Sequence, residues 1–213
     1  MPTTPAVHLH EPRWPPLAGV IVAVALHYAL PASMRIGPPW VGATLVLALA
    51  AVAFRAAVTE QRTLNQRVGY VIVVLLTGAV INGVVRLMLA VIDKSQPPII
   101  LLQSALILWP SNIITFALWY WRLDAGGPLA RAHRPGRHDG AFLFPQMMDT
   151  ERQDERWRPH FIDYLFLSFN TSTAFSPTDV PILSRWAKVL TMIQAVISLA
   201  TVLVLVARAI NTL

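Results

Sequence analysis

The sequence contains no cysteine among its 213 residues. Disulfide bonds, cysteine-ligated metals and thiol catalysis are therefore excluded. Charged residues are also scarce, at 13% of the chain, against about 25% in an ordinary soluble domain. Because 55% of the residues are hydrophobic, a soluble protein of this length could not bury them all. The composition indicates an integral membrane protein.

The net charge is +6, which on its own would fit a nucleic-acid partner. The arginines, however, flank apolar runs and do not form a basic patch with its own fold. We therefore expect a lipid bilayer as the partner and no nucleic acid.

Several apolar runs approach the roughly 20 residues that a helix needs to cross the hydrocarbon core. They cover about 17–33, 39–58, 68–92, 98–121 and 186–210. The sequence thus predicts an all-α, multi-pass protein of the cell membrane with about five transmembrane helices.

The segment between the fourth and fifth runs has a different character. Residues 122–160 carry seven arginines and six acidic residues and contain glycine and proline clusters typical of loops. A short apolar patch at 141–145 is expected at the membrane interface. The following run, 161–175, is too short for a comfortable span and contains Asp163 and Asn170. It favours a re-entrant helix, which requires surrounding protein or a water-filled cavity.

The sequence from Asp163 onward resembles the pore module of the potassium-channel superfamily, which consists of a pore helix, a selectivity filter and an inner helix. Thr171, Thr173, Asp179 and Lys188 fall at matching positions without a gap. The resemblance implies a filter-like loop, a symmetric oligomer (a tetramer in that superfamily) and monovalent cations as possible ligands. The filter-like loop comprises Thr171, Thr173, Ala174, Phe175, Ser176, Pro177, Thr178 and Asp179.

One departure from that module is large. Ser176, Pro177 and Thr178 replace the Gly-Tyr-Gly core, and the chain has no glycine after Gly140. Potassium filters are built from backbone carbonyls held in conformations that glycine adopts easily, and proline fixes its own φ. A conducting form is therefore expected to discriminate weakly between potassium and sodium. Alternatively, 176–179 starts a short helix capped by Ser176, with Pro at the first position and an acid at the third.

The chain is also similar to a family of uncharacterised bacterial integral membrane proteins, some of them labelled ion-channel-like. The shared motifs are Trp109-Pro110-Ser111-Asn112, 118–121 with 124–128, and the block 169–179. The apolar runs, the charged segment and the pore-module resemblance together divide the chain into four regions. These are a polar N-terminal segment (1–16), a four-helix transmembrane region (17–121), a charged loop (122–160) and a pore-loop-like module (161–213).

The last apolar run carries a polar stripe. Lys188, Thr191, Gln194, Ser198 and Thr201 recur at three- and four-residue spacing and so share one helix face. Polar groups within a span face the bundle interior or water. Two interpretations fit the stripe: a hydrated pore lining, or hydrogen bonding between helices.

Three further polar residues lie inside predicted spans. Asn82 and Arg86 are one turn apart, and Asn112 lies in the next span. Arg86 either extends its side chain to the interface or pairs with Asp93 or Asn112. The small residues Ala79 and Gly83 would allow a close helix approach beside it.

The sequence shows no catalytic constellation, no metal-ligand cluster and no cofactor motif. We therefore expect a non-enzymatic protein, and three functions fit. The first is a pore-loop ion channel that conducts cations as an oligomer. The second is a non-conducting membrane scaffold or partner-binding protein with a pore-like fold, and the third is a small-solute transporter.

The basic residues predict the orientation. With five spans and one re-entrant segment, thirteen of them fall on one side and four on the other, and the positive-inside rule places the larger set in the cytoplasm. The larger set is Arg13, Arg55, Arg62, Arg67, Arg122, Arg131, Arg134, Arg137, Arg152, Arg156, Arg158, Arg185 and Lys188, and the smaller set is Arg35, Arg86, Lys94 and Arg208. The re-entrant segment would then insert from the cytoplasmic side, opposite to potassium channels.

Overall fold

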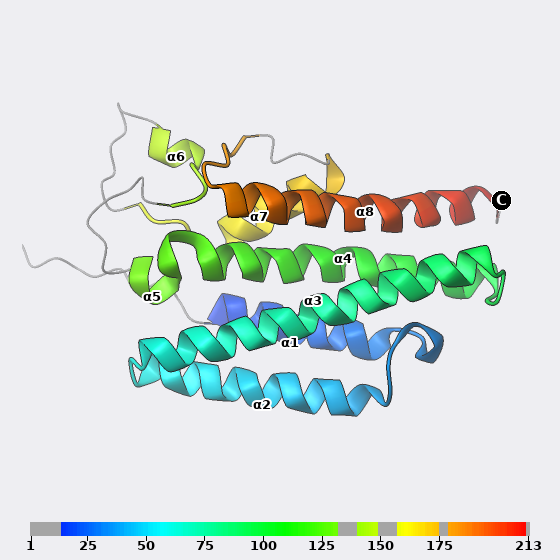
Figure 1. Cartoon of the computed structure of the whole chain (residues 1–213), viewed down its shortest axis with the longest axis horizontal. Coiled ribbons are helices and arrows are strands. Elements are labelled where there is room, and N and C mark those ends of the chain that lie inside the picture. Colours follow the sequence, from blue (N-terminus) through cyan, green and yellow to red (C-terminus); the bar gives the residue numbers. More distant parts are fainter. Residues whose placement is uncertain (1–13, 132–139, 149–156, 175–178, 212–213) are drawn as a thin grey trace, which may run out of the picture.

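A computed structural model describes residues 14–131, 140–148, 157–174 and 179–211, and these residues are helical apart from turns and connections. Four long helices lie side by side along the long axis of the molecule, with α1 and α7 packed among them (Figure 1). The all-α class expected from the sequence is confirmed for this part of the chain.

The helices follow one another in a simple order. Their bounds are α1 Trp14–Ala29, η1 Ala32–Met34, α2 Pro39–Val58, α3 Arg62–Ile92, α4 Pro98–Leu123, η2 Asp124–Gly126, α5 Pro128–Arg131, α6 Pro145–Met148, α7 Phe161–Thr173 and α8 Arg185–Asn211. Both α2 and α4 begin with proline at the first helical position, where its fixed φ suits a helix and its missing N–H costs nothing.

Four helices are long and apolar enough to cross a membrane: α2, α3, the α4 segment through Gly126, and α8 through Ala207. Large apolar side chains such as Val52, Val74 and Val196 are exposed on their outer faces, as expected for surfaces that meet lipid. The chain is therefore a multi-pass membrane protein. The first apolar helix, α1, has 16 residues and is shorter than these four.

Helix α4 lies at the centre of the bundle and packs against α1, α3, α7 and α8. A close approach between α3 and α4 depends on Gly83, because a Cβ there would lie 2.6 Å from Cδ2 of Leu108. The sequence singled out Gly83 as a small residue that would permit such an approach.

Helices α7 and α8 run in the same direction. Ser168 of α7 contacts Gln194 of α8, and Ser172, one turn later in α7, contacts Ser198, one turn later in α8. A helix pair with parallel directions needs a connection that returns along the full length of the first helix. The chain between the end of α7 at Thr173 and the start of α8 at Arg185, here called the return segment, supplies that connection, and the structure describes its residues 174 and 179–184.

The apolar patch of the charged loop, which the sequence placed at the membrane interface, is buried within the protein. Ala141, Phe142 and Phe144 are at most 6% exposed, and they pack into the end of the bundle formed by α4, α7 and α8. Phe142 also pairs with Ile182 in an isolated antiparallel bridge. The patch is apolar because it fills the protein core.

The direction of α8 leads to a topology prediction. A reporter inserted at residue 136, shortly after α5, should be cytoplasmic. The end of the bundle that carries α5 also carries the arginine-rich start of α3, end of α4 and start of α8 (Figure 1). A reporter fused after Leu213 should be on the opposite side, because α8 crosses the membrane between the two positions. A reporter in the α3–α4 turn at Ser95 serves as the control and should match the C-terminal fusion. Reporter activity in one compartment at both 136 and the C-terminus would contradict this arrangement.

Candidate functional site

A fully buried glutamine joins three helices at the centre of the bundle. The side chain of Gln194 in α8 is 0% exposed. Its Nε2 is 2.8 Å from the carbonyl oxygen of Ser168, 2.8 Å from the Ser168 hydroxyl and 2.7 Å from the Ser172 hydroxyl, all in α7. Its Oε1 accepts a hydrogen bond from the phenol of Tyr120 in α4. Both ends of this amide are thus satisfied away from water.

Neighbouring polar groups extend the same network. The side-chain amide of Asn112 in α4 donates to the backbone carbonyl of Gln194 at 3.2 Å. The Ser198 hydroxyl donates to the backbone carbonyl of Ser172 at 2.7 Å, and the Ser168 hydroxyl donates to that of Ile113 at 2.6 Å. Interhelical hydrogen bonds in membrane proteins contribute about 0.6 kcal/mol each on average. Their geometry fixes how α7 lies against α4 and α8.

The polar stripe of the last helix lies inside the protomer. Gln194, Ser198 and Thr201 are 0% exposed and Thr191 is 6% exposed, while Lys188 is exposed at the start of α8. Gln194 and Ser198 bond to neighbouring helices, as the hydrogen-bonding interpretation expects. The Thr191 and Thr201 hydroxyls donate to carbonyl oxygens of α8 itself. Residues on the other side of α8, among them Val189, Met192 and Leu203, are exposed.

Four of the filter-like residues, Thr171, Thr173, Ala174 and Asp179, lie in the described part of the chain. Thr171 is buried and its hydroxyl donates to the Leu167 carbonyl at 2.9 Å. Thr173, Ala174 and Asp179 are exposed. Phe175, Ser176, Pro177 and Thr178 lie outside the described residues.

The short helix considered for residues 176–179 does not continue after Asp179. Residues 179–184 form a turn, an isolated bridge and a bend, and the next helix begins at Arg185. Ser184 caps that helix, since its hydroxyl oxygen accepts from the Ala187 amide at 3.4 Å.

The polar pair in α3 lies at the opposite end of the bundle. The guanidinium of Arg86 donates to Asn82 Oδ1 at 3.1 Å and to the Ser33 carbonyl at 3.4 Å. The partners considered from the sequence, Asp93 and Asn112, are not the ones it contacts. Asn112 is 0% exposed and belongs to the network around Gln194.

A buried carboxylate that sequence reasoning missed anchors the charged loop. Asp124, at the end of α4, is 1% exposed. It accepts hydrogen bonds from the Tyr164 hydroxyl at 2.6 Å and the Ala141 amide at 2.5 Å. A Cβ at Gly140 would lie 2.8 Å from Asp124 Oδ1, so glycine is required where the chain passes this carboxylate. The acid beside Gly126-Gly127, together with a later lone glycine, was the available signal.

Arg131 completes this cluster. It is 6% exposed and donates to the carbonyl oxygens of Trp121 and Asp124 at 2.9 and 3.1 Å. Its guanidinium also lies 5.1 Å from the ring centre of Tyr164, a cation–π distance. The arginine therefore ties the end of α4 to the start of α7.

Aromatic rings close the same end of the bundle. Phe142 lies edge-on to Tyr120, Tyr164 and Trp186, with ring centres 5.1, 6.2 and 6.0 Å apart. These partners belong to α4, α7 and α8. One loop residue thus holds the starts of α7 and α8 against the end of α4.

The first turn of α7 is capped by its own acid. The backbone amide of His160 donates to Asp163 Oδ2 at 2.7 Å. Burial raises the pKa of Asp163 above its usual value, and the hydrogen bond from the His160 amide lowers that pKa in part. Asp163, which looked out of place in an apolar run, is therefore explained as a helix cap.

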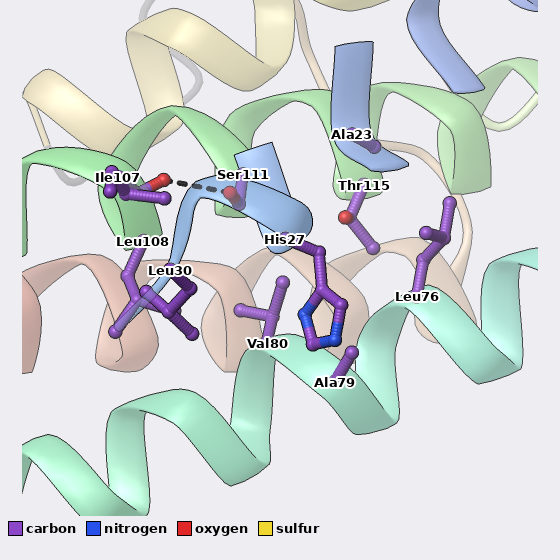
Figure 2. A pocket seen from close by; sticks show the side chains of 10 residues that line it. All are labelled: Ala23, His27, Leu30, Leu76, Ala79, Val80, Ile107, Leu108, Ser111 and Thr115. Carbon is purple, nitrogen blue, oxygen red and sulfur yellow. Dashed lines mark hydrogen bonds between the residues drawn. The ribbon is translucent and has the colours of Figure 1, made fainter. Parts of the chain in front are cut away.

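A small cavity lies between α1, α3 and α4 (Figure 2). Its volume is about 20 Å³, and its lining includes His27, Ser111 and Thr115. The Thr115 hydroxyl is buried with no hydrogen-bond partner among the described residues. This volume suits a single water molecule and is too small for an organic solute.

No group of three or more potential metal ligands occurs in the described part of the chain. Comparisons with protein-family models, with curated proteins and with solved structures found no match. The function is therefore inferred from the geometry of α4, α7 and α8.

The Gln194 network gives a stability prediction. Replacing Gln194 with leucine removes its bonds to α4 and α7 and leaves the buried Tyr120 and Ser172 hydroxyls without this partner. We expect destabilisation by about 2–3 kcal/mol, from bonds of about 0.6 kcal/mol each and the stranded polar groups. Unfolding in mixed detergent micelles measures this. The control Met192→Leu lies on the exposed face of α8 and should change stability little, and an equal loss in both variants would contradict the proposed role.

The buried stripe gives an accessibility prediction. Cysteine introduced by Ser198→Cys or Thr201→Cys should not react with a membrane-impermeant maleimide in the native protein, because both positions are 0% exposed. Asp179→Cys, at an exposed position, serves as the reactive control, and all three should react after denaturation. The native chain has no cysteine, so the background is clean. Native labelling of Ser198→Cys at the rate of the control would restore the pore-lining interpretation of the stripe.

Proposed function

We propose that this protein is a pore-loop membrane protein of the cell membrane whose oligomer conducts monovalent cations with weak selectivity. The observation that carries the proposal is the parallel pair of α7 and α8 joined by a return segment, with α4 packed against both. This is the order of short helix, loop and inner helix that the sequence resemblance implies.

The length of α7 supports a re-entrant element. Its 13 residues extend about 20 Å at 1.5 Å per residue, less than the roughly 30 Å of hydrocarbon. In the proposed arrangement α7 inserts from the arginine-rich side and stops part-way across, and α1 serves as the fifth span. A helix end at that depth requires a protein or water environment, which neighbouring subunits would supply.

The end of α7 also has the charge that a cation requires. A helix C-terminus carries a partial negative charge, and such ends coordinate cations in broken-helix membrane proteins. Thr173 and Ala174 are exposed there. In the proposed oligomer the cation path follows this helix end and the return segment, and does not follow the polar stripe of α8.

One observation favours a second candidate, a non-conducting scaffold with a pore-like fold. Because the polar face of α8 is buried, the part of α8 that is free to meet another subunit is apolar, including Val189, Val196 and Leu203. An axis lined by such residues would dewet and block ions. The transporter alternative has less support, since the cavity between α1, α3 and α4 has only about 20 Å³.

Flux measurements test the proposal. Purified protein reconstituted in liposomes should pass potassium and sodium at comparable rates, and a potassium preference above about a hundredfold would instead indicate an ordered carbonyl filter. Asp179→Asn should lower cation flux, because an exposed carboxylate on the return segment concentrates cations. Glu60→Gln makes the same charge change in the α2–α3 turn and should leave the flux unchanged.

The oligomeric state separates the two candidates. An intact oligomer that passes no ions would favour the scaffold. A protein that stays monomeric in nanodiscs would overturn the shared pore, because a single re-entrant loop cannot surround a path.

A further inference from the structure

Arg122, near the end of α4, has no carboxylate partner among the described residues. Its Nη1 donates to the Asn65 carbonyl at 3.1 Å and to Asn65 Oδ1 at 2.8 Å, and its guanidinium lies 5.1 Å from the ring centre of Trp121. These partners are neutral. The charge of this half-buried arginine is therefore available to an anion.

The fold makes room for this guanidinium. A Cβ at Gly69 in α3 would lie 2.1 Å from Cζ of Arg122 and 2.5 Å from its Nε. Only glycine allows the planar group to lie flat against α3 at this position. Asn65, one turn earlier, is held in place by its own bond to the Ala53 carbonyl at 2.8 Å.

A pocket of about 90 Å³ opens beside Arg122. Its polar lining comes from Arg62, Asn65 and Gln66 in the first turns of α3, and the η2–α5 turn at Gly126-Gly127 closes it. The α3 N-terminus carries no acidic residue in its first turn and no side-chain cap, so its partial positive charge adds to that of the two arginines. No acidic residue is found in the lining of this pocket among the residues that the structure describes.

The position of the pocket indicates the kind of anion. It lies where α3 begins and α4 ends, at the arginine-rich end of two membrane-crossing helices. The positive-inside rule assigns that end to the cytoplasmic leaflet, which contains anionic lipids, and basic pockets between helices on that side bind their head groups. The Gln66 side-chain amide donates a hydrogen bond to the Tyr70 hydroxyl at 2.9 Å. Beyond the pocket, Val74, one further turn along α3, is 55% exposed. An apolar surface suited to an acyl chain thus continues from the pocket.

We propose that this pocket binds the phosphate of an anionic phospholipid, with Arg122 and Arg62 as its ligands. A guanidinium donates two parallel hydrogen bonds to phosphate oxygens. The phosphate would lie over Arg122 between α3 and the Gly126-Gly127 turn, and Arg62 would contact it from the exposed rim. This site is separate from the proposed ion path at α7.

The test measures thermal stabilisation of the purified full-length protein in neutral detergent. A ligand that binds only the folded state raises the melting temperature. Short-chain phosphatidylglycerol should raise it in a saturable way, whereas phosphatidylcholine should not. Equal shifts with the two lipids would overturn the proposal, and a shift with inorganic phosphate as large as that with phosphatidylglycerol would show a free-phosphate site.

Matched variants locate the binding. Arg62→Gln should weaken the apparent affinity for phosphatidylglycerol about fivefold, as expected for one charge near a lipid head group. Arg122→Gln and Gly69→Ala should weaken it more, because both remove or displace the guanidinium inside the pocket. Arg67→Gln, an exposed arginine in the same helix that does not line the pocket, should bind as the native protein does. Equal weakening by Arg62→Gln and Arg67→Gln would indicate general electrostatic attraction to the surface and would overturn the proposed site. This comparison does not require Arg122→Gln to fold.

Discussion

The packing of the described part of this protein depends on keeping one polar side chain, Gln194, satisfied in the middle of an apolar bundle. A buried amide without partners costs about 1–3 kcal/mol or more, so α8 can adopt few rotations relative to its neighbours. The rotation observed places Gln194 against Tyr120 of α4 and against Ser168 and Ser172 of α7. Hydrophobic packing would specify this rotation much less strongly, because lipid tails are as apolar as the surfaces of the helices.

The same constraint decides which surfaces remain for other molecules. Because the polar face of α8 is directed inward, its outward face is apolar beyond the first turn, where Arg185 and Lys188 are exposed. Other exposed polar groups of the pore-like region include Thr173 at the end of α7 and Asp179. Arg122, where α4 meets α3, is likewise fixed by hydrogen bonds that decide what remains available to other molecules. Its bonds to Asn65 orient the guanidinium without neutralising it, so the interaction that fixes its position leaves its charge available.

Hydropathy predicted the long helices to within a few residues, because each must satisfy its backbone internally while exposing apolar side chains. For α2 the predicted and observed bounds agree at both ends. Periodicity also placed Gln194 and Ser198 on one face, but it could not say what that face meets, since a hydrated path and a hydrogen-bonded partner require the same spacing. The roles of Asp124 and Phe142 were missed for a related reason. Each lies in a segment whose charges and glycines resemble an ordinary loop, and only the fold brings them to the starts of α7 and α8.

These contacts restrict where movement could occur in the α7 region. The start of α7 is held by the bond between Asp124 and Tyr164 and by the packing of Phe142 on Tyr164. Its middle is held by Gln194 and its last turns by Ser198. The chain is held again from Val180, which is buried, through Pro181, whose carbonyl accepts a hydrogen bond from the Leu143 amide at 3.0 Å, to Ile182, which pairs with Phe142. Both α7 and residues 180–182 are therefore fixed to the bundle, one before and one after the segment where the sequence resembles a filter.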